Sequence, residues 1–182
     1  MTDDEHDWIR KSLQGDPEAF ESLVRRHQRM IYALAYRMTG SAAEAEDLTQ
    51  ETFIRAHGQL ANFRADARFS SWLYRIAVNL CLNWRKRAVR RDQLHHEWRQ
   101  QQEPAPAPDT SLTRQVQDAL LKLNAKQRAA IVLTTYDGLS HAEAARALGC
   151  SETTVSWRVF AARAKLKRLL RRAIAGGDDE QP

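Results

Sequence analysis

Cysteine, glycine and proline are scarce in this chain of 182 residues, which contains 2 Cys, 7 Gly and 5 Pro. Cys81 and Cys150 lie far apart and form no CxxC pair, which excludes a disulfide scaffold and a Cys-rich zinc module. We expect both to be reduced packing residues. The low glycine and proline content excludes a collagen-like or low-complexity chain, and the 43% of apolar residues suffices for a core.

Long hydrophobic runs are also missing. The longest uncharged apolar stretch, residues 30–36, is far shorter than the ~20 residues that a membrane-spanning helix needs. The first residues are acidic and no apolar run follows them, unlike a secretory signal. We therefore expect a cytoplasmic protein without direct membrane insertion.

Charge is unevenly distributed along the chain, although the formal net charge is only +5. Residues 3–21 carry seven acids and two bases, and residues 44–51 carry four acids and no base. Residues 85–91 carry five bases and no acid, and residues 152–172 carry seven bases and one acid. Two separate basic clusters predict two contacts with a polyanion, and solvated helix faces are the alternative.

Hydrophobic periodicity and capping signals predict an all-α chain. Asp16-Pro17, Ser41 with Glu44, and Ser140 with Glu143 are typical helix starts. We expect helices over residues 17–38, 42–57, 111–122, 125–136 and 152–174, a short one before Gly15, a long one from residue 68 and a short one after Ser140. A proline-rich linker is expected at 99–110. It would join two small helical domains, 1–98 and 111–175, with a flexible tail at 176–182.

Residues 140–155 have the layout of a helix-turn-helix. Gly149 permits the left-handed turn that joins a short first helix to the second one. On the helix that follows, one stripe is apolar and is expected to face the core: Val155, Val159, Ala162, Leu166 and Leu169. The opposite side combines aromatic rings, hydroxyls and cations: Thr153, Ser156, Trp157, Phe160, Arg163 and Lys167. This side indicates a recognition helix in a DNA major groove. Packing against another helix of the same domain is the alternative.

Two further helices carry candidate binding surfaces. The helix at 42–57 presents Asp47, Gln50, Glu51 and Ile54 on its outer face, which suits a basic partner; a merely solvated face is the alternative. The next helix buries Phe69, Leu73, Ile76 and Leu80. Beside that stripe lie Trp72, Arg75, Asn79, Asn83, Lys86 and Arg90. Rings, amides and cations along one line suit single-stranded bases, and a core aromatic with a solvated basic end is the alternative.

Taken together, these residues resemble the bacterial RNA polymerase sigma factors of the extracytoplasmic-function (ECF) group. The resemblance covers residues 15–172. It rests on the opening at 15–20, a polymerase-binding motif at 45–53, a promoter-melting motif at 63–64 and 69–79, a −10-reading segment at 83–87 and a −35-reading helix-turn-helix at 138–163. The order of these motifs, with the linker between them, makes the resemblance specific.

The resemblance implies a role for each group of residues. Core RNA polymerase would dock on Asp47, Gln50, Glu51, Phe53 and Ile54. The −10 element, with a base extruded from the single strand, would meet Phe69, Trp72, Arg75, Asn79, Asn83, Arg85, Lys86 and Arg87. The −35 duplex would meet Thr153, Ser156, Trp157, Arg158, Phe160, Arg163 and Lys167.

The chain departs from the family where Ser156 and Trp157 replace a common basic and small polar pair, and where Ala161 replaces a frequent Arg. Fewer bidentate donors are then present to read guanine.

No third-domain segment separates the halves, so we expect silencing by an anti-sigma factor, of which a membrane-bound protein is one form. We expect no enzyme activity, cofactor or metal, because no Ser-His-Asp arrangement, P-loop or HExxH is found. A stand-alone helix-turn-helix regulator and a helical scaffold are the rival functions.

Overall fold

The computed structural model describes residues 3–64, 68–94 and 112–175, and this part of the chain contains eight α-helices and no strand. The predicted all-α fold is therefore confirmed. The predicted linker at 99–110 and the predicted tail at 176–182 lie outside the described residues. Below, the N-terminal half means residues 3–94 and the C-terminal half means residues 112–175.

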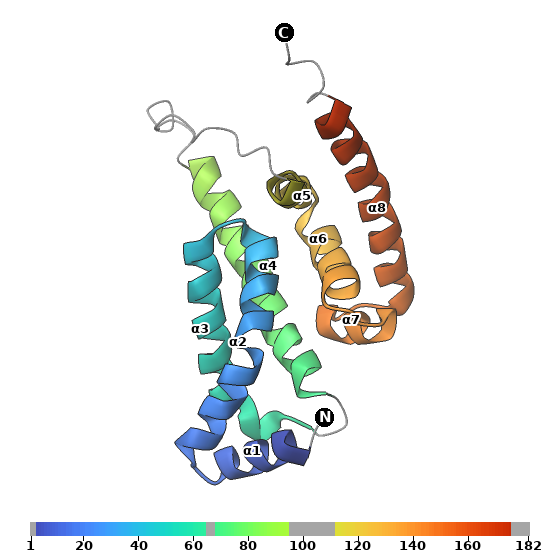
Figure 1. Ribbon diagram of the computed structural model, residues 1–182. Helices are drawn as coiled ribbons and strands as arrows, with labels where there is room; N and C mark the ends of the chain where they lie inside the picture. The colour runs from blue at the N-terminus through green and yellow to red at the C-terminus, as the bar shows by residue number, and fades with distance from the viewer. Residues whose placement is uncertain (1–2, 65–67, 95–111, 176–182) are drawn as a thin grey trace.

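The N-terminal half is a bundle of four helices, α1 (Asp3–Leu13), α2 (Pro17–Thr39), α3 (Ala42–Gln59) and α4 (Phe69–Leu94), with a 3₁₀ turn η1 (Leu60–Asn62) after α3. Helices α2, α3 and α4 pack against one another, and α1 lies across one end of α2 (Figure 1). This arrangement leaves one long side of α3 and one of α4 available to other molecules.

Local capping signals set the ends of α2 as predicted. The Asp16 carboxylate accepts hydrogen bonds from the backbone N–H groups of Glu18 and Ala19, at 2.9 and 3.3 Å. Gly40 ends the helix with φ of +78°, a left-handed conformation that favours glycine. A Cβ atom on Gly40 would also lie 2.5 Å from Cδ1 of Leu121, so a larger residue here would have to displace the end of the Leu121 side chain.

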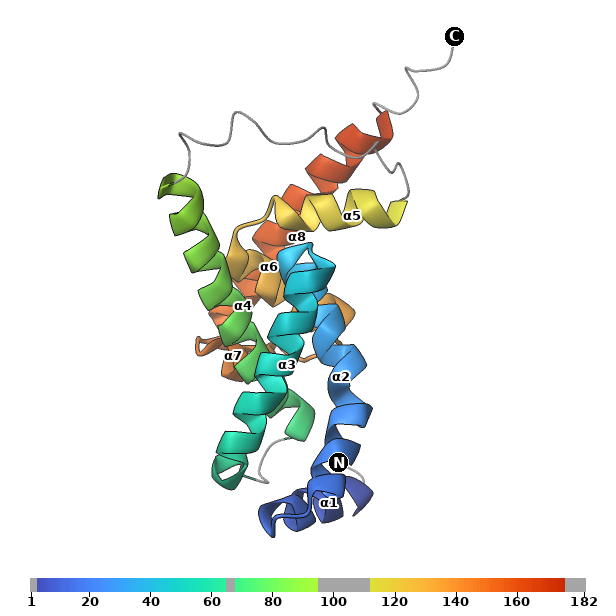
Figure 2. The same ribbon diagram turned by 90° about the vertical axis from the view of Figure 1, so that its left-hand side faces the viewer.

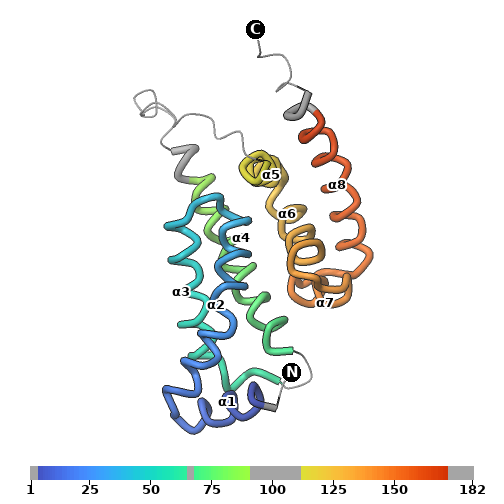
Figure 3. The backbone as a smooth tube through the Cα atoms, viewed as in Figure 1, coloured from blue at the N-terminus to red at the C-terminus, as the bar shows by residue number. Residues whose placement is uncertain are grey.

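The C-terminal half contains α5 (Leu112–Leu121), α6 (Ala125–Ile131), α7 (His141–Leu148) and α8 (Glu152–Ala175). Helix α8 packs against α5, α6 and α7, and Figure 3 traces it past both α6 and α7. The helix predicted over 125–136 has the expected extent, but residues Val132–Tyr136 form a π-helical turn, η3, instead of continuing as α-helix. There the Asp137 N–H donates to Val132 O at 3.1 Å, which widens the backbone before the turn into α7.

The two halves pack directly on each other. Helix α4 contacts α7 and α6, and α5 lies across the end of α2 that carries Gly40 (Figure 2). Buried residues of both halves form one continuous apolar cluster. Sequence periodicity predicted one buried stripe on α4, but Tyr74, Ala77 and Cys81 on its other side are buried too. The second buried side results from the packing of α6 and α7 there.

Arg128 on α6 joins the halves through backbone carbonyl groups. Only 1% of this residue is exposed. Its guanidinium donates to Leu120 O at 2.8 Å, to Leu123 O at 3.1 Å and to Leu121 O, all near the end of α5, and to Met38 O of α2 at 2.5 Å. Burial lowers the Arg128 pKa to about 10, which leaves the group charged at neutral pH. Arg128 therefore supplies donors to backbone carbonyls at the ends of α5 and α2, where helices lack their own donors.

A second polar contact between the halves surrounds Asp137. Its Oδ1 lies 3.9 Å from Nη1 of Arg37, and the Arg37 guanidinium carbon lies 4.6 Å from the centre of the Tyr136 ring. The Asp137 side chain is only 6% exposed, and its Oδ2 has no hydrogen-bond partner among the described residues. Burial raises the Asp137 pKa to about 7, and nearby Arg37 opposes this rise without cancelling it.

Replacing Arg128 should destabilise the chain strongly. Arg128→Met leaves several buried carbonyl groups without a donor, and we expect the free energy of unfolding to fall by about 3 kcal/mol. Urea denaturation followed by circular dichroism measures the loss. Lys126→Met, at an exposed position on the same helix, is the control and should change stability by less than about 0.5 kcal/mol. Equal effects of the two variants would contradict the assigned role of Arg128.

Asp137 should make stability depend on pH. Its pKa is about 7 in the folded chain against 3.8 as a reference, so the folded state binds a proton that the unfolded state has released. Stability should therefore fall as the pH rises from about 4 to about 7 and stay level above that range. Asp137→Asn should abolish this slope and raise stability at pH 8 by about 1–3 kcal/mol. Urea denaturation at a series of pH values checks both, and an unchanged slope in Asp137→Asn would refute the assignment.

Candidate DNA-binding and partner-binding surfaces

The outer face of α3 combines acids with an exposed isoleucine, as the sequence predicts. Asp47 and Gln50 are exposed, and Ile54 is 67% exposed. Glu51 is half-buried and accepts a hydrogen bond of 2.6 Å from Nε of Arg55. Phe53 is buried, so it supports this face from behind and does not reach a partner itself.

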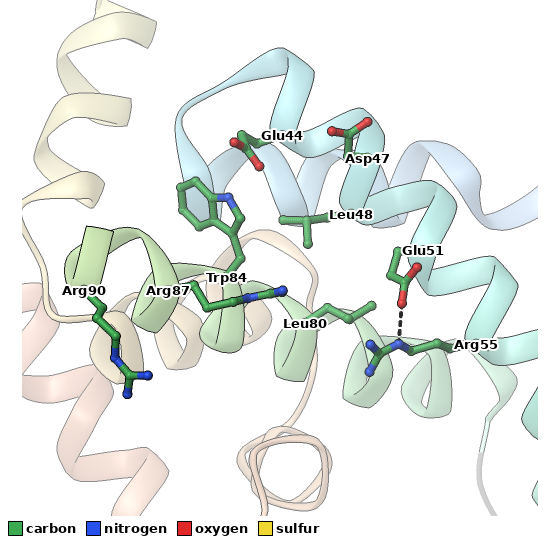
Figure 4. Close-up of a pocket in the computed structure, with 9 residues that line it drawn as sticks. All are labelled: Glu44, Asp47, Leu48, Glu51, Arg55, Leu80, Trp84, Arg87 and Arg90. Atoms are coloured by element: carbon green, nitrogen blue, oxygen red, sulfur yellow. Dashed lines mark hydrogen bonds and ion pairs between the residues drawn. The ribbon is translucent and has the colours of Figure 1, made fainter. Parts of the chain in front are cut away.

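A groove of about 660 Å³ lies between α3 and α4, and we call it the α3–α4 groove. It is lined by Glu44, Asp47, Leu48, Glu51 and Arg55 of α3 and by Leu80, Trp84, Arg87 and Arg90 of α4. Figure 4 shows Asp47 and Glu51 on the α3 wall and Trp84 and Arg87 on the α4 wall. An apolar floor between walls of opposite charge suits a helix that carries both apolar and charged side chains.

An aromatic cluster lies at the start of α4. Phe63, Phe69 and Trp72 contact one another with ring centres 5.4 to 5.5 Å apart. Phe69 is fully buried and also contacts His27, whose Nε2 lies 2.7 Å from Oε1 of the buried Glu5. Phe69 was predicted to contact DNA, but its burial limits it to supporting Trp72. The Trp72 ring is half-buried and remains accessible from outside.

A second groove, of about 510 Å³, lies beside this cluster, and we call it the Trp72 groove. Its lining includes Asn62, Phe63, Arg64, Ser71, Trp72 and Arg75 from the N-terminal half, and Glu143, Arg146 and Ala147 of α7. Hydrogen bonds from the backbone and hydroxyl of Ser140 lower the Glu143 pKa, so this carboxylate is ionised. A negative side chain of the C-terminal half therefore shares the groove with the exposed cations Arg64 and Arg75.

The remaining residues predicted to bind the −10 element continue along α4. Asn79, Asn83, Lys86 and Arg87 are exposed and Arg85 is half-buried. Trp72, Arg75, Asn79, Asn83 and Lys86 repeat every three or four residues, so the structure brings them onto one side of the helix. Arg87 differs, because it lines the α3–α4 groove instead.

The helix-turn-helix forms as predicted in α7 and α8. Ser140 and Glu143 make a full capping box at the start of α7, and Gly149 adopts a φ of +59° at its end. Val155 and Val159 of α8 are buried, which directs the opposite side outward. Trp157 and Phe160 on that side are 65% and 74% exposed. Thr153, Arg163 and Lys167 are exposed as well.

Two residues predicted to contact the −35 element make hydrogen bonds within the chain. Ser156 Oγ donates to Glu152 O at 3.1 Å and lies 2.8 Å from Nδ1 of His141. Because the only hydroxyl proton goes to Glu152 O, Nδ1 of His141 is the donor in the second contact. Arg158 donates to Sγ of Cys150 at 3.3 Å. Periodicity could not predict either contact, since both depend on how α7 and the turn fold against α8.

Sequence reasoning missed the residues that hold the halves together. No role was predicted for Arg128, which follows two other polar residues, although residues 131 and 132, on the same helix face, are buried. That periodicity is the signal that would have marked Arg128 as buried. Within residues 3–64, 68–94 and 112–175, no cluster of His, Cys, Asp and Glu has the arrangement of a metal site. No helix within those ranges has the length and hydropathy needed to cross a membrane.

Comparison with known proteins agrees with the geometry of both halves. The model of sigma-70 region 2 matches residues 23–91, and that of sigma-70 region 4 matches residues 113–166. The chain is 39% identical over 162 residues to the ECF RNA polymerase sigma factor SigM of Mycobacterium tuberculosis, covering 87% of this chain and 80% of the relative. It is 34% identical over 177 residues to the ECF RNA polymerase sigma factor SigW of Bacillus subtilis, covering 90% and 95%.

Two solved structures resemble most of the chain. One is CnrH in complex with the cytosolic domain of CnrY, with a TM-score of 0.70 and 32% identity over 93% of this chain and 99% of that one. The other is the sigma factor RpoE in complex with the anti-sigma factor NepR from Bartonella quintana. It has a TM-score of 0.68 and 25% identity over 84% of this chain and 96% of that one.

Proposed function

Because the chain belongs to the ECF RNA polymerase sigma factors, we propose that it binds core RNA polymerase, recognises −35 and −10 promoter elements and helps to melt the DNA. It would thereby start transcription of a stress or signal regulon. As a transcription initiation factor it is not an enzyme. The observation that carries this proposal is that both family matches occur in order on one chain, and each matched half presents an exposed surface of suitable chemistry.

The proposed division of labour follows the two family matches. Residues 1–98 form the polymerase-binding and −10-binding domain, and residues 111–175 form the −35-binding domain. Residues 99–110 connect them, and residues 176–182 are a tail. The matches at 23–91 and 113–166 fall inside the two proposed domains, which supports this division.

Core polymerase binds the outer face of α3 in this proposal. Asp47, Gln50 and Glu51 offer acceptors and negative charge, and Ile54 supplies an apolar anchor that is otherwise costly to leave in water. Buried Phe53 holds the face in place. The α3–α4 groove continues this surface, and a partner helix with basic and apolar side chains would fit it.

The −10 element binds along α4 as a single strand. Opening duplex DNA costs about 1.4 kcal/mol per base-pair step, and stacking of an extruded base returns about 1–3 kcal/mol. Trp72 supplies the stacking ring, Asn79 and Asn83 face the base edges, and Arg75 and Lys86 neutralise phosphates. A few captured bases would then offset a short bubble, with polymerase supplying further contacts.

The closed packing of the halves explains how the factor is kept silent. Glu143 and Arg146 of α7 line the Trp72 groove, so a DNA strand enters it only after α7 has moved away from α4. Of the two similar solved structures, one is a sigma factor bound to an anti-sigma factor, and the other is CnrH bound to the cytosolic domain of CnrY. We therefore propose that an anti-sigma factor, free or membrane-bound, holds this chain closed in the bacterial cytoplasm.

Transcription reconstituted from purified components tests the proposal. Core polymerase with this chain should start transcripts at discrete sites on genomic DNA, and neither component alone should do so. Ile54→Lys should weaken binding to core polymerase at least tenfold, because it puts a cation beside the acids of α3. Leu13→Lys, at an exposed leucine of α1, is the control and should bind normally. Binding of duplex DNA by the free chain with no transcripts would favour a stand-alone regulator instead.

Trp72→Ala should separate polymerase binding from DNA opening. Removal of the stacking ring should leave the affinity for core polymerase unchanged and reduce open-complex formation at least about fivefold, in line with about 1–3 kcal/mol per stacked base. Permanganate reactivity of unpaired thymines measures the open complex. Trp72→Phe keeps an aromatic ring and should retain most of the open-complex formation. Wild-type reactivity in Trp72→Ala would show that this ring captures no base.

A further inference from the structure

The centre line of the exposed face of α8 is apolar. Thr153, Trp157, Phe160 and Ala164 fall within about 60° of one another on the helix, at 100° per residue. All four are exposed. We call them the apolar ridge. Trp157 and Phe160 lie in the first half of the helix, the part of a recognition helix that enters the major groove.

Polar side chains in the same half of α8 are directed elsewhere. The Ser156 hydroxyl is hydrogen-bonded within the chain, to Glu152 O and to Nδ1 of His141. Arg158 is half-buried and donates to the Cys150 sulfur in the preceding turn. Bidentate reading of guanine needs an Arg or Lys aimed at the base edges. The part of the helix nearest the bases offers none.

The exposed cations lie further along the helix. Arg163 and Lys167 flank the apolar ridge on one side. They lie about one turn and two turns beyond Phe160, respectively. This placement suits contact with phosphates at the rim of the groove, where no base is read.

We propose that this chain reads its −35 duplex through thymine methyl groups, which Trp157 and Phe160 of the apolar ridge contact in the major groove. The inference rests on the proposed function and specifies the DNA that the α8 surface selects. The C5-methyl of thymine is the one apolar group that a base pair presents in the major groove, and Thr, Ala and Phe side chains are its usual partners. Bases contacted by the ridge are therefore thymines, and guanine hydrogen bonds contribute little there.

The first step of the test obtains the −35 sequence with the full chain bound to core polymerase. Selection from random duplex DNA upstream of a fixed −10 element yields the preferred −35 element. Each thymine in it is then replaced by deoxyuridine, which lacks only the methyl group. We expect binding to weaken about threefold to fivefold at two or more positions, consistent with the loss of one buried methyl group each.

The variants assign the methyl contacts to named side chains. Trp157→Ser and Phe160→Ala should each bind the thymine duplex more weakly and lose the effect of deoxyuridine at one position. Arg163→Ala should keep that effect and lower the salt slope by about 0.9 through loss of one phosphate contact. Leu112→Ala, at an exposed leucine of α5, is the control and should match the unsubstituted chain. Thermal melting confirms that each variant is folded.

Two results would overturn the inference while leaving the proposed function intact. One is a selected −35 element in which deoxyuridine has no effect at any position. The other is a loss of binding on replacement of guanine by 7-deazaguanine that exceeds every deoxyuridine effect, since this change removes only the N7 acceptor. Failure of the chain to direct core polymerase to any selected DNA would instead refute the proposed function itself.

Discussion

The packing of the two halves depends on one interaction, the capture of helix-end carbonyl groups by the buried Arg128 guanidinium. The last carbonyls of any helix lack partners within the helix, and burying them without donors is costly. Arg128 supplies these donors to α5 and α2 at once, and Gln117 adds a bond of 3.1 Å to Tyr36 O. The Leu121 side chain packs on Gly40 and would have to shift to admit a larger residue there. The end of α2 is thus completed by residues that lie some eighty to ninety positions away.

The same packing leaves one of the two predicted DNA-binding surfaces exposed and partly covers the other. The outward side of α8 is free of the interface, since Trp157 and Phe160 are largely exposed in the closed arrangement. The Trp72 groove is shared with α7, whose Glu143 carries a negative charge close to Arg64 and Arg75. In the proposed function, contact with duplex DNA therefore needs no rearrangement, whereas contact with single-stranded DNA needs the halves to separate. A protein that binds across both halves would delay the second step more than the first.

Local signals in the sequence predicted most of the fold, and long-range contacts account for what they missed. Asp16, Gly40, Ser140 and Gly149 set helix ends through neighbours a few residues away, so their positions could be predicted from spacing alone. The exposure of Ile54, Trp157 and Phe160 followed from helical periodicity. Burial of Asp137 could not be predicted this way, because it depends on contact with the other half of the chain. For Arg128, periodicity marks the inward helix face, but its bond to Met38 O in the other half could not be predicted. The contacts of Ser156 with His141 and of Arg158 with Cys150 likewise depend on how α7 and the turn before α8 fold against α8. The π-helical turn at Val132–Tyr136 has no simple sequence pattern, since it serves to bring Asp137 and Tyr136 against Arg37.

Helix α4 lines both the Trp72 groove and the α3–α4 groove, with Trp72 in the first and Trp84 in the second. A rise of 1.5 Å per residue sets these two rings about 18 Å apart along a single rigid rod. Whatever docks against the second ring is consequently held at a fixed offset from whatever stacks on the first. In the proposed function, the length of α4 between the two rings would therefore set where the strands open relative to the bound polymerase.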